Sequence, residues 1–252
     1  MFMTDLLKFS QGNAKLKSRL ILSLPAGKTC PGAVFCKAFA VVDNNGKRSI
    51  QDGKDTIFRC FAASSEVQYD AVYNSRAHNL ELIMQCITGH VIGSQSRHSL
   101  TELINNSLQH YRKKNHKLVR IHESGDFFSP GYLKAWIEVA NLNPDLKFYC
   151  YSKSLDLFMD VALPSNFFLT ASYGGKFDHL IDAGHFPRFA KVFANEQEAI
   201  DAGLSVDHDD SHCFADGPFA LLVHGTQPKG SAMGKAIRER RKANQFSGYS
   251  KR

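Results

Sequence analysis

Residues 20–36 read Leu-Ile-Leu-Ser-Leu-Pro-Ala-Gly-Lys-Thr-Cys-Pro-Gly-Ala-Val-Phe-Cys, and this stretch decides the fold. Its apolar start predicts a buried strand, and the proline and glycine after it predict a loop that carries Cys30 and Cys36. A third cysteine, Cys60, lies just before the next predicted helix. Three soft ligands gathered at one strand end would hold an iron–sulfur cluster or a zinc ion. Free cysteines are also often small buried hydrophobes, so a structural role stays open.

The composition is that of an ordinary globular protein. At 252 residues and 43% hydrophobic, the chain is long enough for one α/β domain covering residues 1–252, with a Cys-bearing loop at 25–61. No apolar run is long enough to span a bilayer. Residues 1–8 lack the basic region and long apolar core of a secretory signal. We therefore expect a cytoplasmic protein with reduced thiols, in the host cytoplasm if a phage encodes it.

The positive charge is concentrated at the end of the chain. Seven basic residues and one acid lie between Lys235 and Arg252, so the rest of the chain carries only +1 of the formal charge of +7. A basic helix and tail over 232–252 could contact the phosphates of a nucleic acid. An ordinary solvated C-terminal helix has the same composition, because basic residues suit the end of a helix. Both interpretations stay open.

Strand and helix patterns alternate along the chain. With the strand before the cysteines, further strands are predicted at 118–123, 148–153, 167–171, 190–194 and 219–223. Helices are predicted from Ser64 or Ser65 to 87, and over 99–110, 130–141, 155–161, 196–202 and 232–243. Alternating strands and helices indicate βα units and a parallel sheet. We prefer a partial (β/α)6 barrel to a flat sheet, because polar residues follow every strand and would converge only if the sheet curls.

Polar residues come directly after most strands, where parallel α/β folds bind ligands. Glu123 and Asp126 could accept an ammonium group or a ribose hydroxyl, although Asp126 could equally cap a turn. Lys153 could contact a phosphate or a carboxylate, or could simply be a solvated strand end. Tyr173 and His224, each at a strand end, are expected to line the same cavity.

The run from Asp207 to Cys213 packs three carboxylates, two imidazoles and a thiol into seven residues. His208, Asp209 and His212 could therefore bind a divalent metal or take part in acid–base chemistry. Plain surface loops have similar compositions, so this reading also stays open.

Several stretches resemble the bacteriophage gene product 88 family, which occurs in phages and mobile elements. The stretches lie at 24–33, 59–63, 120–128, 151–154, 169–175, 207–212 and 222–228. The resemblance covers nearly the whole chain from Leu20 to Tyr249, and it implies a protein of phage or mobile-element type.

The architecture is also similar to the radical S-adenosylmethionine superfamily. That resemblance implies that Cys30, Cys36 and Cys60 hold a 4Fe-4S cluster whose remaining iron binds the methionyl group. It also implies a cofactor-binding role for a set at the ends of the next strands, namely Ser124, Gly125, Asp126 and Ser152. The spacing departs from the superfamily's Cys-x3-Cys-x2-Cys, since five and then twenty-three residues separate the cysteines here.

Three hypotheses follow. The first is an iron–sulfur enzyme that is similar to the radical S-adenosylmethionine enzymes and acts on a nucleotide or nucleic acid. The second is a metal-dependent hydrolase or nuclease whose cysteines hold zinc and whose catalytic groups are Glu123, Asp126, His208, Asp209 and His212. The third is a nucleic-acid-binding or host-interaction protein in which the cysteine site has only the structural role of holding a long loop in place.

Overall fold

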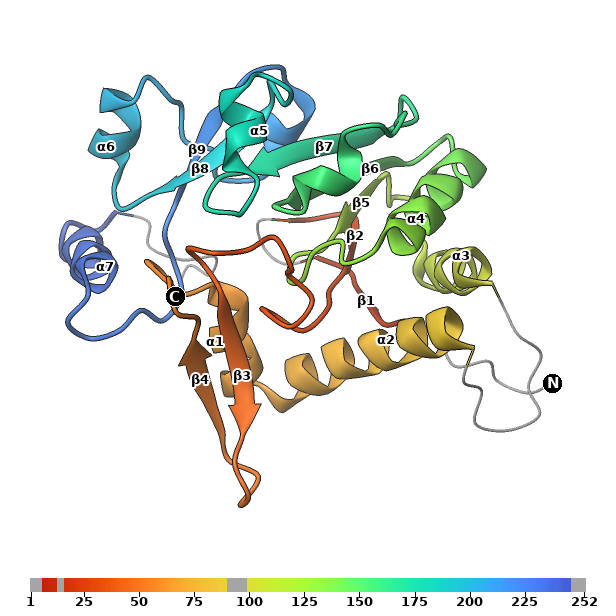
Figure 1. The fold of residues 1–252 in the computed structure, drawn as a ribbon, viewed down its shortest axis with the longest axis horizontal. Coiled ribbons are helices and arrows are strands. Elements are labelled where there is room, and N and C mark those ends of the chain that lie inside the picture. Colours follow the sequence, from red (N-terminus) through yellow and green to blue (C-terminus); the bar gives the residue numbers. More distant parts are fainter. Residues whose placement is uncertain (1–5, 13–15, 90–98, 246–252) are drawn as a thin grey trace.

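A seven-stranded, mostly parallel sheet forms the centre of the computed structural model, which describes residues 6–12, 16–89 and 99–245 (Figure 1). The strands are, in their order across the sheet, β1 (Phe9–Ser10), β2 (Arg19–Leu22), β5 (Leu118–Ile121), β6 (Lys147–Ser152), β7 (Phe167–Ser172), β8 (Phe189–Phe193) and β9 (Phe219–Leu222). β1 pairs antiparallel with β2, and every later pair is parallel. The predicted α/β class and parallel sheet are confirmed.

The order of the parallel strands across the sheet is their order along the chain. Each new strand therefore adds beside the previous one, which brings all their carboxyl ends to one edge. β1 and β9 are the two edges, and within the described residues no strand pair joins them, so the sheet is not a closed barrel. The predicted strands lie within about two residues of the observed ones.

The helices differ in how closely they follow the prediction. They are α1 (Phe61–Gln68), α2 (Asp70–Thr88), α3 (Leu100–Tyr111), α4 (Pro130–Leu142), α5 (Asp178–Asp182), α6 (Glu196–Asp201) and α7 (Ala232–Lys242), with short 3-10 turns η1 (Leu155–Phe158) and η2 (Ser211–Phe214). Ser99 caps α3 through a reciprocal capping box with Glu102, and Ser129 caps α4 before Pro130, as predicted. The helix predicted at 155–161 is wrong, since only one 3-10 turn forms there.

The long helix predicted from Ser64 or Ser65 to residue 87 is two helices. Tyr69 adopts an extended conformation (φ −127°, ψ 116°), which ends α1 and starts α2. Both serines lie inside α1 and cap nothing, because that helix already begins at Phe61, with Cys60 as its N-cap residue. Asp70 in the first turn of α2 favours a new start there.

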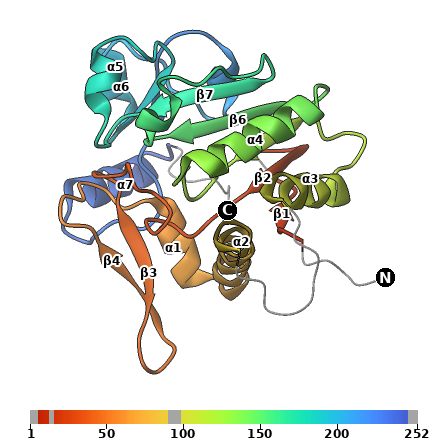
Figure 2. The same ribbon diagram turned by 45° about the vertical axis from the view of Figure 1, so that its right-hand side comes forward.

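The Cys-bearing loop 25–61 contains an antiparallel hairpin that the sequence analysis did not predict. β3 (Ala38–Val42) pairs with β4 (Arg48–Asp52), and the hairpin lies beside α1, away from the main sheet (Figure 2). The turn contains Asn45-Gly46 with Gly46 at φ +78°, a dipeptide that favours tight hairpin turns. Arg59 then binds Asp52 through two guanidinium nitrogens, which brings the chain from the hairpin to Cys60.

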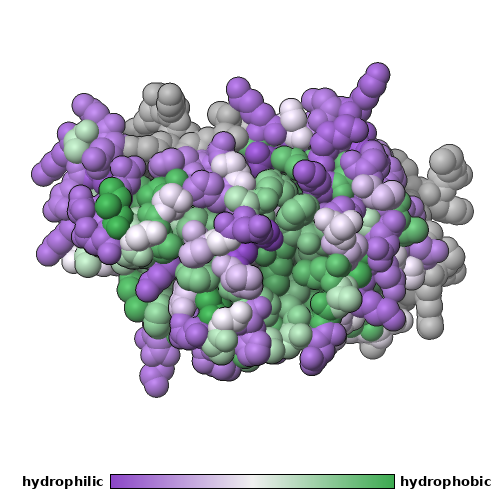
Figure 3. Space-filling model, turned by 90° about the horizontal axis from the view of Figure 1, so that it is seen from above, coloured by the Kyte–Doolittle hydropathy of each residue, from purple (hydrophilic) through white to green (hydrophobic). Residues whose placement is uncertain are grey.

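The main core lies between the sheet and helices α3 and α4. Trp136 and Tyr132 of α4 are fully buried there, as are Phe148 and Cys150 of β6. Seen from above, apolar side chains gather near the middle of the molecule's surface, with polar side chains around them (Figure 3). Among the described residues, no helix combines the length and apolarity needed to cross a bilayer.

Candidate metal centre and its cavity

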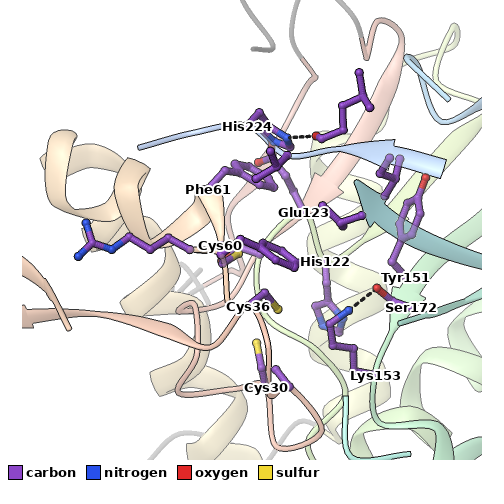
Figure 4. Close-up of a pocket in the computed structure, with 18 of the residues that line it drawn as sticks. Cys30, Cys36, Cys60, Phe61, His122, Glu123, Tyr151, Lys153, Ser172 and His224 are labelled. Atoms are coloured by element: carbon purple, nitrogen blue, oxygen red, sulfur yellow. Dashed lines mark hydrogen bonds between the residues drawn. The ribbon is translucent and has the colours of Figure 1, made fainter. Parts of the chain in front are cut away.

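A cavity of about 200 Å³ opens at the carboxyl ends of the parallel strands. Cys30, Cys36 and Cys60 follow one another along the cavity, and Glu123, Tyr151 and Lys153 lie to their right in the view of Figure 4. Its lining also includes Ser124, Gly125, Asp126, Ser172, Phe58, Phe61, Arg120, Asp207, His208, Asp210, Leu222, Val223, His224 and Arg240. The three cysteines are therefore brought together where the sequence predicted.

Backbone contacts fix the loop that carries Cys30 and Cys36. The N–H groups of Val34 and Phe35 donate to the Gly174 carbonyl at 3.1 and 2.9 Å, which ties the loop to the end of β7. Gly32 packs so closely on the end of β6 that a Cβ at this position would lie 2.2 Å from the Lys153 carbonyl oxygen. These contacts hold the loop against two strand ends.

Cys60 joins this loop at the start of α1. Its N–H donates to the Cys36 carbonyl at 3.2 Å, and Cys60 itself is the N-cap residue of the helix. The Ala62 N–H bonds to the Cys60 sulfur and lowers the pKa of that thiol. A helix N-terminus stabilises a thiolate, so this position suits a sulfur that binds a metal.

Burial is the largest influence on the pKa values of the Cys30 and Cys60 thiols. It raises the pKa of Cys30 well above its ordinary value, and the neighbouring Asp126, Cys60 and Cys36 raise that pKa further. Burial and then Cys36 raise the pKa of Cys60 to about 12. The thiols are close enough to act on one another electrostatically, and a metal that binds them must displace their protons.

Across the described part of the chain, no three Cys, His, Asp or Glu side chains are arranged to hold a single metal ion. Thiolates of an iron–sulfur cluster bind different irons, so their sulfurs lie farther apart than the ligands of one zinc ion. A cluster and a single zinc ion therefore require different spacings of the three sulfurs.

The turn after β5 packs directly on the cysteine loop. Gly125 has φ +89°, and a Cβ there would lie 2.7 Å from both the Leu24 Cβ and the Thr29 hydroxyl, so only glycine fits. Asp126 is buried and accepts bonds from the Ser152 hydroxyl and the Lys153 N–H, at 2.7 and 2.8 Å. Burial raises the pKa of Asp126, although these bonds oppose the rise. Asp126 therefore orients the end of β6.

Two polar groups of this turn line the cavity and have unused hydrogen-bonding capacity. Ser124 is 3% exposed, and its hydroxyl has no hydrogen-bond partner among the described residues. Glu123 is half-buried, with a carboxylate oxygen 3.9 Å from Arg76. Arg76 in turn binds the buried Glu66, which accepts the Ala26 N–H of the cysteine loop. Ligand groups could use both Ser124 and Glu123.

Lys153 is a buried cation beside the cysteine loop. Its ammonium donates to the Ser172 hydroxyl and the Tyr173 carbonyl, and no carboxylate of the described residues lies within 4.0 Å of it. Two of its three N–H donors are thus used by neutral groups. A ligand carboxylate or phosphate could take the third.

The opposite wall is built around Asp210. This buried carboxylate accepts bonds from Arg120 and Tyr149, both at 2.8 Å, and Arg19 lies 3.6 Å away. Tyr151 bonds to its other oxygen at 3.3 Å. Asp210 is saturated by protein groups and acts as the centre of a charged network.

The rim of the cavity carries two of the predicted histidines. His224 stacks on Phe61 with ring centroids 4.4 Å apart. His208 is half-exposed and lies 3.9 Å from Glu196. Both line the cavity, as expected of His224.

Four predicted residues do not line the cavity. Ser152 is buried behind Asp126, and the Tyr173 hydroxyl bonds to Asp182 outside it. Asp209 bonds to the Ser211 N–H in an exposed turn, and His212 packs edge-on against Phe219. The expectation that Tyr173 lines the cavity is therefore wrong, because its backbone carbonyl faces Lys153 while its ring points elsewhere.

The sequence analysis missed several residues that line the cavity. Arg120 and Tyr151 are inward-facing strand residues, and a charged residue inside an apolar strand was the available signal for the first. Arg240 was counted in the basic tail, yet it is buried on the inner face of α7. Residues 246–252 of that tail, and 1–5 of the N-terminal segment, lie outside the described residues.

Comparison with known proteins gives the chain a family. Two relatives match it over 146 residues, or 56% of this chain: the Gene 88 protein of Mycobacterium phage L5 is 30% identical, and that of Mycobacterium phage D29 is 29% identical. The matched part covers 51% and 50% of the two relatives, so the chain spans about half the length of the curated relatives it matches. No solved structure matches, and these findings do not support the resemblance to the radical S-adenosylmethionine superfamily. The family model described as Gene product 88 matches residues 6–245, and the chain belongs to this phage family.

Proposed function

We propose that this chain is an iron–sulfur enzyme in which Cys30, Cys36 and Cys60 hold a 4Fe-4S cluster and S-adenosylmethionine is the co-substrate. The observation that carries the proposal is that the three thiols line one wall of a cavity at the carboxyl ends of parallel strands. The proposal includes a partial (β/α)6 barrel like that of the radical S-adenosylmethionine enzymes, and its support is that the parallel strands of the sheet are added in chain order.

The three cysteines and the groups around them fit a 4Fe-4S cluster in which one iron has no protein ligand. The cavity offers three thiols from two neighbouring segments, and backbone groups of Gly27 and Ala62 bond to two of the sulfurs. Such bonds are a normal feature of cluster sites. When bound, a cluster held by three cysteines supplies one electron and a free iron position. The cavity beside the thiols leaves room for a ligand at that position.

The groups beside the thiols fit an amino-acid moiety. Glu123 and the unpartnered Ser124 hydroxyl can accept bonds from an ammonium group. The remaining donor of Lys153 can bind a carboxylate. Because both sets border the cavity, they would orient the methionyl part of the co-substrate beside the cysteines.

Anaerobic purification with iron and acid-labile sulfide analysis tests the proposal. We expect about four irons and four sulfides per chain, and their loss in Cys30→Ser, Cys36→Ser and Cys60→Ser. Cys86→Ser is the matched control, since Cys86 lies on α2 outside the cavity. Stoichiometric zinc in the wild type, or iron retained in all three variants, would contradict the cluster.

The substrate is proposed to be a nucleotide or nucleic acid. The support is the outer face of α7, where Lys235, Arg238, Arg241 and Lys242 are all exposed. The hydrolase alternative has weaker support, because Asp209 and His212 lie outside the cavity that holds Glu123 and His208. If nucleic-acid affinity and its salt dependence survive reversal of the α7 charges, this substrate assignment is wrong.

A further inference from the structure

Arg240 is the basic residue of α7 that points inward. The buried positions of this helix are Gly234, Ala236, Ile237 and Arg240, which repeat with helical spacing and form its inner face. Arg240 is 3% exposed, whereas Arg238 and Arg241 are exposed to solvent. The apolar face of the helix therefore carries a charged side chain into the protein.

The guanidinium of Arg240 is only partly satisfied. One terminal nitrogen donates to the Val223 carbonyl, and the buried Nε has no hydrogen-bond partner among the described residues. No carboxylate of the described residues forms a salt bridge with it, although Glu196 is near enough to act on its charge. Burial lowers the pKa of Arg240 from its ordinary value, yet a guanidinium stays protonated in proteins. A buried cation with unused donors is costly unless something anionic binds it.

Arg240 lines the same cavity as the cysteines, from the β9 edge of the sheet. It reaches the cavity beside Val223, which follows β9, while Lys153 follows β6. Neighbouring strands are about 4.8 Å apart, so roughly 14 Å of sheet separates the two strand ends. His208 and His224 line the cavity too. The cavity thus has a second cationic end, distant from Lys153.

We propose that Arg240 is a binding subsite for an oxyanion, the phosphate or carboxylate of the substrate. A guanidinium offers a planar fork of donors that matches two oxygens of such a group. The unused Nε supplies one donor of that fork. The proposal rests on the proposed function in that it makes this cavity the substrate site, and it assigns the substrate a negatively charged group at the β9 end.

Arg240→Gln tests the subsite, with Lys134→Gln as the control, because Lys134 is an exposed basic residue of α4 outside the cavity. The probes are inorganic phosphate and acetate, each titrated at constant ionic strength and followed by isothermal calorimetry. We expect saturable binding of at least one anion to the wild type and to Lys134→Gln, and at least tenfold weaker binding to Arg240→Gln. The anion that binds more tightly identifies the substrate group.

A measurement on the wild type keeps the test valid if Arg240→Gln does not fold. In protein labelled with ¹⁵N-arginine, the Nε–H resonance of Arg240, assigned with Arg240→Lys, should shift saturably with the anion. No saturable binding to the wild type, equal binding to Arg240→Gln, or an unmoved Nε–H resonance would overturn the subsite. Iron and sulfide content should be the same in all variants, so loss of this subsite is distinguishable from loss of the cluster.

Discussion

The two walls of the cavity are built in different ways. The cysteine wall, made of the 25–36 loop, the turn after β5 and the end of β6, is held by backbone hydrogen bonds and by glycines that leave no room for a Cβ. The charged wall, made of Arg120, Asp210 and Arg240 with their neighbours, is held by side chains from distant segments. We infer that the cysteine wall fixes the positions of the thiols and that the charged wall sets the electrostatic environment of the cavity. Substitutions in the two walls should therefore differ in their effects on the stability of the protein and on its bound iron.

The largest effect is expected from Gly32→Ala on the cysteine wall. The new Cβ would lie 2.2 Å from the Lys153 carbonyl oxygen, so the loop must move away from β6. We expect a loss of about 3 kcal/mol in the free energy of unfolding, measured by urea denaturation, together with loss of bound iron. Gly131→Ala is the control, because a Cβ there meets nothing within 4 Å. Equal stability of the two variants would refute the rigid-wall description.

On the charged wall, Asp210→Asn should destabilise the protein by about 2 kcal/mol. The amide leaves Arg19 and Arg120 without their carboxylate, whereas the backbone is undisturbed because asparagine tolerates the φ of +66°. Unlike Gly32→Ala, this variant should keep its iron. Asp209→Asn, in the exposed turn next to it, should change stability by less than about 0.5 kcal/mol. Iron loss in Asp210→Asn would show that the two walls are not independent.

A smaller and pH-dependent effect is expected from His122, a buried residue of the cavity lining. Its Nε2 contacts the Tyr132 hydroxyl at 2.9 Å, and burial lowers its pKa to about 3. The unfolded chain, with a pKa of about 6.5, then binds more protons than the folded one between these values. Stability should fall as the pH drops below about 6.5, by at most about 1.4 kcal/mol per pH unit from this group.

His122→Asn isolates that contribution, since asparagine tolerates the φ of +69° at this position. Urea denaturation at pH 7, 6 and 5 should show a shallower pH dependence in the variant than in the wild type. Parallel curves for the two proteins would mean that His122 is not held neutral by burial.

The contrast between the walls also explains what the sequence could predict. The cysteine wall depends on local signals, namely prolines, glycines and polar residues directly after apolar strands, and these placed Cys30, Cys36, Cys60 and the turn after β5 correctly. Helix starts at Ser99 and Ser129 were predicted because caps are local too. The sheet followed from the alternation of strands and helices.

The charged wall depends on contacts between distant segments, which no local pattern reveals. Arg120 and Asp210 are 90 residues apart, and Arg240 resembles its exposed neighbours in sequence. The break at Tyr69 was missed because the apolar stripe continues across it, so periodicity alone gave one helix. The hairpin could have been found from Asn45-Gly46 and the β-forming residues of β3.

Electron paramagnetic resonance of the anaerobic, dithionite-reduced protein tests the central claim most directly. The account predicts the signal of a reduced 4Fe-4S cluster in the wild type and in Cys86→Ser, its absence in Cys36→Ser, and a changed signal when S-adenosylmethionine is added. A protein without such a signal, or a signal that persists in Cys36→Ser, would contradict a cluster held by the three cysteines of the cavity.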